Sequence, residues 1–393
     1  MDIRIFWLAL GTFALSAESF ALPSLLPDVT ADTGVTLVQG GYLVLAFAMA
    51  YAIGAPILAA ISGGWERRAV LAGSTAVYAI ATIAAGLAAS YGLLMTARIV
   101  MALAVGLYSA TAQATAVAMS TPQQRARAVA VVVGGTTLAV AFGAPLGGLI
   151  ANLVGWRGAY AMVAVIAVVA AVAIFLLVPA GMRGAKVPLR ERLSVVTQPG
   201  VMPALIVMLL YMTGGFTVYT YIAPLTVSAV GLDKTMLPAV LLAFGIGAAL
   251  GNFAGGQLAD RIGALRTTLG ASVLLAVILA LLSVVPHLDH AIAGPLFVAL
   301  VVAWGIVAWS FPPAQASRIL KLAPNNAPLV LSLNWSALYF GVALGSVIGG
   351  QVLQRGSALD LGWVAALFSL AAAAVIWATN PAHGRLPAVA RLG

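Results

Sequence analysis

Two charged residues stand alone inside long apolar segments of this 393-residue chain, and both have side chains that can take part in proton chemistry. Glu18 lies in the apolar run 5–27 and Arg98 lies in the run 92–119. At ~1.5 Å of helix rise per residue, both fall ~12–14 Å from the same end of their helices. A carboxylate in an apolar cavity binds a proton more readily through desolvation and less readily beside a cation. Moving Arg98, or a cationic substrate, relative to Glu18 would therefore load or unload a proton. A fixed structural ion pair is the alternative.

Other kinds of chemistry find no support in the sequence. Cysteine is absent, and the three histidines lie in a loop and a tail without the spacing of metal ligands. The sequence contains no G-x-x-x-x-G-K-[ST] phosphate loop and no recognisable Ser/His/Asp set. We therefore expect that the chain is not an enzyme, holds no cofactor or metal, and does not use ATP by itself.

The composition requires a bilayer around the two charges. Apolar residues make up 63% of the chain and charged residues 7%, with a mean hydropathy of +1.09. Soluble domains typically run about 45–50% apolar and about 25% charged. The pattern predicts an all-α membrane protein with twelve transmembrane helices. The apolar runs cover 5–27, 36–62, 69–90, 92–119, 128–154, 158–180, 201–230, 236–258, 266–286, 291–313, 328–354 and 360–379.

The positions of the basic residues predict how the chain is oriented. With the N-terminus inside, most of the 19 Lys and Arg residues fall in the two tails and the even-numbered connections. The outer connections hold only Arg157, Lys234 and Arg355. Because Lys and Arg resist translocation, we expect a multi-pass protein of a bacterial cytoplasmic membrane with both termini in the cytoplasm. The net charge of +9 therefore reflects membrane orientation and does not indicate a nucleic-acid partner.

The chain divides into two similar halves. The longest polar connection, 181–200, predicts a cytoplasmic linker between a six-helix bundle over 1–180 and another over 201–393. The segment 142–150 aligns with 340–348, although Gly/Ala-rich helices can also resemble each other through composition alone. Parallel repeats of this kind are one plan for transporters, with the substrate site at mid-membrane between them.

Two segments have sequences that predict a role in conformational change. The string GGQLADRIGALR over 255–266 places Asp260 among basic residues, where it can pair across helices and hold one gate state; an ordinary basic loop is the alternative. The residues assigned to this gate and to the corresponding first-half loop are Arg67, Arg68, Asp260, Arg261 and Arg266. Small residues four apart let helices approach closely, and a proline bends a helix. In the fifth run, the small residues and the proline together predict a sliding hinge, with tight packing as the alternative. The hinge residues are Gly143, Pro145, Gly147 and Gly148.

Aromatic and amide side chains within the runs are candidates for a substrate site. As a set they predict a mainly apolar pocket with a few hydrogen-bonding groups, which is typical of small-molecule sites. For each residue alone, packing or anchoring at the membrane interface is the alternative. The candidates are Tyr42, Tyr108, Gln113, Tyr219, Trp304, Asn334 and Tyr339.

The motifs together resemble one known family. The 255–266 string resembles the cytoplasmic loop signature of the major facilitator superfamily, and the fifth-run glycines are similar to a motif of its twelve-helix drug:proton antiporters. With the segments 25–28, 65–68 and 155–157 and with Arg98, the first half resembles the sugar-efflux and chloramphenicol-resistance branch. Glu18 lies one residue earlier than that branch's acid relative to Phe20, a shift of about 100° around a helix.

The resemblance implies a secondary active transporter that exports small molecules, drugs or sugars, by proton antiport with alternating access. Its partners would be the small-molecule substrate, protons and the lipid bilayer, and we expect a monomer. A facilitator or proton-coupled importer of sugars, nucleosides or nucleobases is an alternative, which pH-independent transport would favour. A non-transporting membrane sensor or enzyme is another, which a failure to move any solute would favour.

Overall fold

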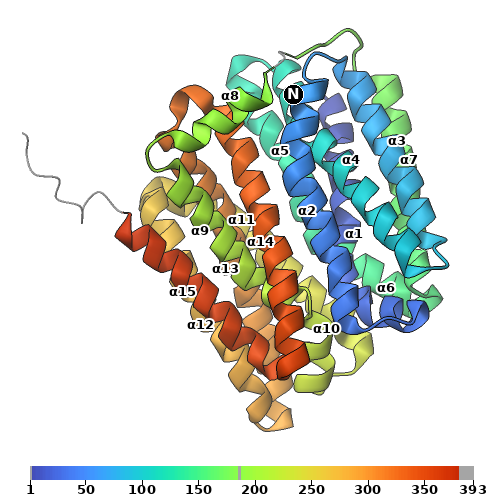
Figure 1. Cartoon of the computed structure of the whole chain (residues 1–393), viewed down its shortest axis with the longest axis vertical. Coiled ribbons are helices and arrows are strands. Elements are labelled where there is room, and N and C mark those ends of the chain that lie inside the picture. The colour runs from blue at the N-terminus through green and yellow to red at the C-terminus, as the bar shows by residue number, and fades with distance from the viewer. Residues whose placement is uncertain (1, 185–186, 380–393) are drawn as a thin grey trace, which may run out of the picture.

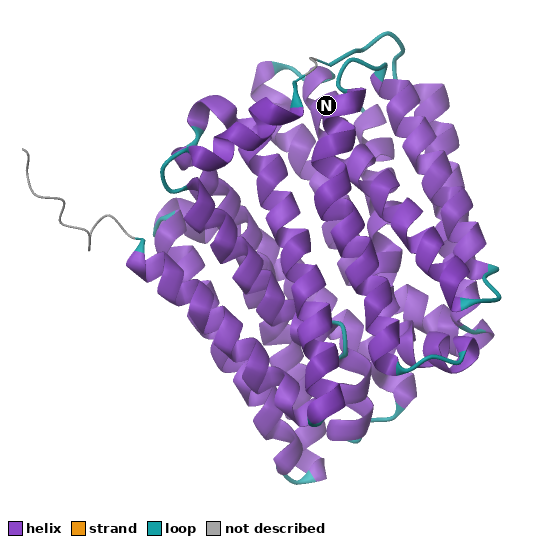
Figure 2. Cartoon of the chain, viewed as in Figure 1, coloured by secondary structure: helices purple, strands orange, loops and turns teal. Residues whose placement is uncertain are grey.

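The computed structural model describes residues 2–184 and 187–379, and helices make up nearly all of this chain (Figure 2). Twelve of the helices described are long and apolar enough to cross a membrane, and each overlaps one predicted run. The predicted number of spans is therefore confirmed. Lys186 of the predicted linker, and Arg385 and Arg391 of the predicted C-terminal tail, lie outside the described residues.

The first six spans come from eight labelled helical segments. The fifth span is continuous through α5, the π-helical turn η2 and α6. The segments are α1 (Arg4–Thr33), α2 (Leu37–Ser62), α3 (Arg67–Gly86), α4 (Tyr91–Ala118), α5 (Arg125–Leu138), η2 (Ala139–Gly143), α6 (Ala144–Val154) and α7 (Trp156–Leu177).

A short helix, α8, precedes the remaining six spans. The segments are α8 (Leu189–Ser194), α9 (Val201–Tyr219), α10 (Ile222–Pro224), the π-helical turn η4 (Leu225–Ala229), α11 (Leu237–Arg261), α12 (Ala264–Val284), α13 (His290–Leu322), α14 (Ala327–Arg355) and α15 (Leu361–Ala378).

Two of the predicted runs differ from the helices observed. The predicted tenth run ends at 313. The observed helix α13 continues to Leu322 through Pro312 and Pro313, so Arg318 lies inside a helix. A proline removes one backbone hydrogen bond, and membrane helices tolerate this where neighbouring groups satisfy the freed carbonyl. The seventh run is not one helix either, because α9 ends at Tyr219 and α10 begins at Ile222.

The halves lie side by side and meet along two seams. In Figure 1 the helices of the first half, blue to green, lie beside those of the second half, yellow-green to red. One seam joins α2 to α14, and the other joins α11 to the fifth span. α8 lies at the end of the molecule where the N-terminus is found, which we call the linker end. The other end, which holds Asp28 and Lys234, is called the Asp28 end.

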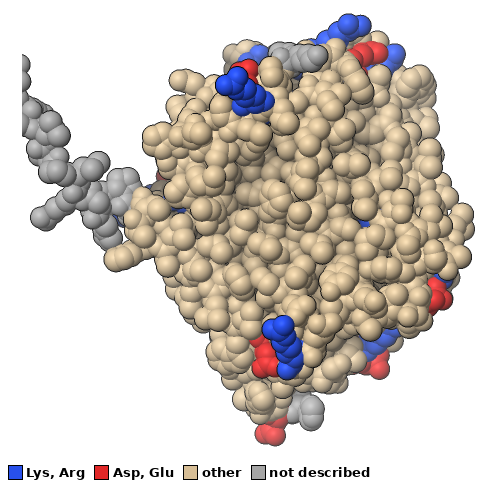
Figure 3. Space-filling view, viewed as in Figure 1, with Lys and Arg blue, Asp and Glu red and all other residues tan. Residues whose placement is uncertain are grey.

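Glycines allow the helices within the second half to pack closely. A Cβ atom on Gly251 of α11 would lie 2.0 Å from the carbonyl oxygen of Ile306 in α13. A Cβ atom on Gly341 of α14 would lie 2.4 Å from the carbonyl oxygen of Leu209 in α9. Figure 3 shows charged side chains gathered at the two ends of the visible face, with an almost uncharged belt between them. Such a belt suits the hydrocarbon core of a bilayer.

Candidate functional site

A buried ion pair joins α1 to α4 in the first half. Arg98 Nη1 donates a hydrogen bond to Glu18 Oε2, and the two side chains are 1% and 2% exposed. The Tyr160 hydroxyl of α7 donates to Glu18 Oε1 at 2.7 Å, so both carboxylate oxygens have a partner. Arg98 Nε also donates to the Leu43 carbonyl at 3.3 Å, and the guanidinium carbon lies 4.5 Å from the centre of the Phe47 ring. Glu18 and Arg98 do lie together, but not at equal distances from their helix ends, because α1 continues past the predicted end at 27 to Thr33.

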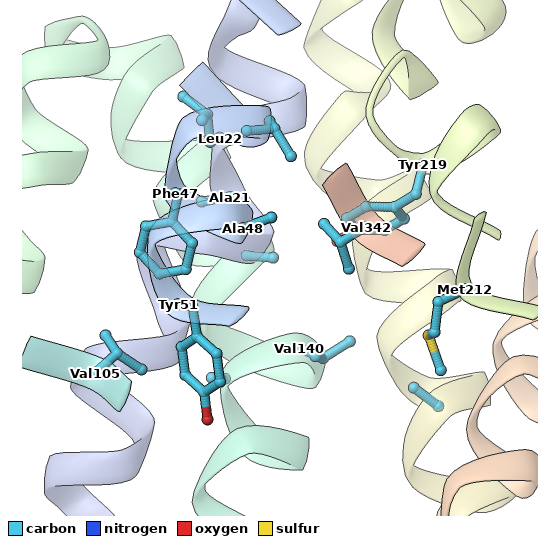
Figure 4. Close-up of a cluster of buried hydrophobic side chains, with 14 of the residues drawn as sticks. Ala21, Leu22, Phe47, Ala48, Tyr51, Val105, Val140, Met212, Tyr219 and Val342 are labelled. Carbon is cyan, nitrogen blue, oxygen red and sulfur yellow. The ribbon is translucent and has the colours of Figure 1, made fainter. Parts of the chain in front are cut away.

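A cavity lies between the two halves beside this pair. It has a free volume of about 100 Å³. Figure 4 shows Phe47 and Tyr51 of the first half facing Met212, Tyr219 and Val342 of the second. The aromatic residues lining the cavity are Phe20, Phe47, Tyr211, Phe216, Tyr219, Phe244, Trp304, Trp309, Trp335 and Tyr339.

Arg98 is the only charged side chain that lines the cavity among the residues described. Glu18 lies behind Arg98 and is not part of the wall. The guanidinium of Arg98 therefore lies between the cavity and the carboxylate.

Three of the predicted substrate residues line the cavity, and two of them, Tyr219 and Tyr339, also contact the first half. The Tyr219 hydroxyl of α9 donates to the Phe20 carbonyl of α1 at 3.0 Å. Tyr339 of α14 stacks on Tyr51 of α2 with ring centres 3.7 Å apart. Trp304 packs edge to face against Tyr219, with ring centres 6.0 Å apart.

The other four predicted substrate residues do not line this cavity in the present conformation. Tyr108 is fully buried inside the first half, where its hydroxyl donates to the Leu8 carbonyl at 2.7 Å. Gln113 bonds back to the Ser109 carbonyl of its own helix at 3.3 Å. Tyr42 and Asn334 are not part of the cavity wall either. Trp309 and Trp335 do line it, and their aromatic residue type within the apolar runs is the same signal that selects Trp304.

Glu66 and the backbone of the first-half loop hold the start of the linker. Arg67 Nη1 donates to the Ala114 carbonyl of α4 at 2.9 Å. Glu66 Oε1 accepts from the Gly181 backbone N–H at 2.9 Å, and Arg68 Nε lies 3.8 Å from the same oxygen. These contacts hold residues 181–184 against the loop between α2 and α3. The pattern differs from the expected gate, because the acid and both arginines are used within the first half.

The second-half loop is free in this conformation. Asp260, Arg261 and Arg266 are exposed at the linker end. Within the described part of the chain, Asp260 has no basic nitrogen within 4.0 Å, so the pairing expected from the sequence is not made here. An unpaired acid on this loop leaves it able to pair in another conformation.

Two exposed ion pairs at the Asp28 end were not anticipated from the sequence. Lys234, which precedes α11, pairs with Asp28 of α1 and so joins the two halves. Arg157 pairs with Asp32, which also accepts from Trp156 Nε1 at 3.2 Å. The sequence did contain a signal for these two pairs. Both acids follow the predicted first run, and both bases lie in the predicted outer connections, so all four fall at the same end of the molecule.

The predicted hinge residues lie where three helices meet. The π-helical turn η2 comes directly before Pro145. Added Cβ atoms on Gly143 and Gly147 would lie 2.8 and 2.9 Å from the Cβ atoms of Ala17 and Ala21 in α1. One on Gly148 would lie 3.2 Å from Pro238 of α11, in the other half. The fifth span therefore touches both halves through small residues.

The described residues form no cluster of side chains that could bind a metal ion. In the ranges 2–184 and 187–379, no group of three or more His, Cys, Asp or Glu side chains is placed to hold an ion.

The twelve spans and the cavity between the two halves have the architecture of a multi-pass membrane transporter. The chain belongs to the Major Facilitator Superfamily, whose model matches residues 8–346 and 205–391. The predicted family, and a transporter instead of an enzyme, are thereby confirmed.

The sequences of related proteins align with most of the chain. The MFS-type transporter YbcL of Bacillus subtilis is 30% identical over 93% of this chain and 92% of its own. The inner membrane transport protein YdhP of Escherichia coli is 30% identical over 89% and 88%. A chloramphenicol resistance protein of Streptomyces lividans is 30% identical over 90% of each chain.

Solved structures share the fold at low sequence identity. The human organic anion transporter MFSD10 matches with a TM-score of 0.71 and 16% identity, over 95% of this chain and 97% of its own. The nucleoside transporter NupG matches with a TM-score of 0.73 and 12% identity, over 96% and 100%.

Proposed function

We propose that this protein exports small molecules, drugs or sugars, from the bacterial cytoplasm by proton antiport, with Glu18 as the proton-binding group. One observation carries the proposal: Arg98 separates the cavity from Glu18, the only buried acid in the ranges 2–184 and 187–379. The similarity to a chloramphenicol resistance protein supports a drug as substrate.

The sign of the coupling follows from the charge left at the cavity wall. While Glu18 is ionised, the pair is neutral and an uncharged substrate meets a compensated wall. A proton on Glu18 removes the counter-charge and leaves Arg98 as a lone buried cation, whose desolvation by an apolar substrate is costly. Uncharged and cationic substrates therefore bind more weakly when Glu18 is protonated. Two ligands that exclude each other can be exchanged across the membrane, which is antiport.

An anionic substrate would reverse that sign, which makes a proton-coupled importer the second candidate. An anion pairs with Arg98 in competition with Glu18, so it binds best after Glu18 has taken up a proton. Proton and substrate then favour each other, which is the requirement for symport. The position of Arg98 on the wall is the observation that keeps this alternative open.

The remaining elements are proposed to provide the conformational change. The bundles 1–180 and 201–393 rock against each other, with the linker end in the cytoplasm together with both termini. Asp28 and Lys234 hold the outer end closed. Asp260 pairs with basic residues only when the linker end closes, and the small residues around Pro145 allow the fifth span to slide. The transporter acts as a monomer.

Transport into inverted membrane vesicles tests the proposal. With an acid interior, wild-type vesicles should accumulate radiolabelled chloramphenicol, and Glu18→Gln vesicles should not. Glu191→Gln is the matched control, because Glu191 lies exposed on α8 away from the cavity. Equal accumulation by wild type and Glu18→Gln would show that Glu18 does not couple the proton.

A further inference from the structure

One polar group on the cavity wall lacks a partner. Trp304 is 1% exposed and lines the cavity, yet within the described chain its indole Nε1 finds no hydrogen-bond acceptor. An indole N–H can only donate, so neither a rotated hydrogen nor a change of tautomer can satisfy it. Buried donors of this kind are nearly always paired in native structures. An acceptor supplied by a ligand would pair it.

The ring of Trp304 is fixed by its neighbours. Its centre lies 4.9 Å from that of Phe244 and 6.0 Å from that of Tyr219, both close to edge to face. Such packing leaves the indole little freedom to swing toward another acceptor. The N–H is therefore held in place before a ligand arrives, which lowers the entropy lost when a hydrogen bond forms.

The wall of this cavity offers hydroxyl groups and one guanidinium, and no carboxylate from residues 2–184 or 187–379 lines it. The Ser19 hydroxyl of α1 lines the same cavity and is also unpartnered in the part of the chain that is described. Arg98 lies on the wall with its counter-charge Glu18 behind it, so the charged group nearest the cavity is a cation. Most of the remaining surface is aromatic.

We propose that the transported ligands are uncharged planar aromatic molecules with a hydrogen-bond acceptor, and that Trp304 Nε1 donates to this acceptor. The inference rests on the proposed function in taking this cavity as the substrate site. The aromatic wall stacks on the planar ring. A cation in this cavity would lie nearer to Arg98 than to Glu18, so the repulsion outweighs the attraction and cations are disfavoured.

Equilibrium dialysis against purified protein in lipid nanodiscs tests this with three molecules of nearly the same shape. Quinoline has one acceptor nitrogen and is uncharged near neutral pH, naphthalene has no acceptor, and N-methylquinolinium is a cation. Empty nanodiscs give the blank for partition into lipid. Quinoline should bind wild type more tightly than either of the other two.

The variant Trp304→Phe removes the donor but keeps an aromatic ring. It should weaken quinoline binding about five- to tenfold, which corresponds to the loss of one hydrogen bond, and leave naphthalene binding unchanged. Trp309→Phe is the matched control, since Trp309 lines the same cavity, and it should reduce quinoline binding less. The comparison of the two ligands separates the hydrogen bond from packing.

Several results would overturn the inference. These are an equal loss for quinoline and naphthalene in Trp304→Phe, unchanged quinoline binding in that variant, tighter binding of N-methylquinolinium, or no binding of quinoline. The expected binding pattern without proton-driven transport would contradict only the proposed antiport. Proton-driven transport without the binding pattern would contradict only the assignment of the ligand class.

Discussion

Breaking the pair between Glu18 and Arg98 on one side should destabilise the protein strongly. The side chains are 2% and 1% exposed, so Arg98→Met leaves a buried carboxylate whose remaining partner is the Tyr160 hydroxyl. Removing one partner of a buried pair costs about 3–5 kcal/mol. The hydrogen bond from Tyr160 persists and places Arg98→Met near the lower figure. Glu18→Gln removes the counter-charge but keeps an amide oxygen that can accept from Arg98 Nη1, and we expect a similar loss because Arg98 becomes an uncompensated buried cation.

The double variant Glu18→Gln/Arg98→Met removes both charges together. Replacing a buried pair by hydrophobic groups of similar volume is often neutral or stabilising. Here Met replaces Arg98 and the amide that replaces the Glu18 carboxylate keeps the Tyr160 hydroxyl, so the double variant should unfold at a higher temperature than either single variant. Asp32→Asn and Arg157→Met provide a matched control pair, because these side chains are 43% and 46% exposed. Exposed pairs contribute about 0–1 kcal/mol, and those variants should change little.

Thermal unfolding of the purified variants in nanodiscs checks the prediction. A wild-type unfolding temperature for Arg98→Met, or losses that add in the double variant, would refute the reasoning. Transport by the same proteins separates the coupling role from a purely structural ion pair. A coupling pair predicts that the double variant regains stability without regaining proton-driven transport. A purely structural pair predicts that it regains both.

Three further changes test the gates and the packing. Asp260→Asn should lower the maximal transport rate several-fold with little change in binding affinity, because the loop lies away from the cavity; a lowered affinity in dialysis with an unchanged rate would place Asp260 in the site. Asp28→Asn should cost at most about 1 kcal/mol of stability, since the pair with Lys234 is exposed, but labels across the Asp28 end should report more opening by distance measurement. Gly251→Ala should destabilise by about 1–3 kcal/mol, because its Cβ would lie 2.0 Å from a carbonyl oxygen. Gly256→Ala, with nothing within 4 Å, should be neutral or slightly stabilising in the same thermal unfolding assay.

The sequence was sufficient for the spans but not for the faces of the helices. Apolar runs report membrane crossings directly, because the bilayer sets their length. Inside a membrane, however, the lipid-facing and protein-facing sides of a helix are both apolar, so no periodicity distinguishes them. Tyr108 and Gln113 therefore looked as suitable for the cavity as Tyr219, although the structure turns them away.

The charged site shows the same division. Glu18 and Arg98 stood out in the sequence as lone charges within two apolar runs of the same half, and they do pair. The residue counts ended the first span too early, because α1 continues to Thr33. Which of them would face the cavity depends on the rotation of α1 and α4 about their axes, which neighbouring helices determine. The contact between Asp28 and Lys234 joins segments far apart in the chain and required the packing of both halves.

Proton release on substrate binding is the most direct test of Glu18 as the group whose protonation excludes substrate. Purified protein in weakly buffered solution is mixed with chloramphenicol, and a pH indicator dye reports the protons released. Because an uncharged substrate favours ionised Glu18, wild type should release protons in the pH range where Glu18 is partly protonated, and Glu18→Gln should release none. Proton uptake by wild type, or equal release by wild type and Glu18→Gln, would contradict the mechanism.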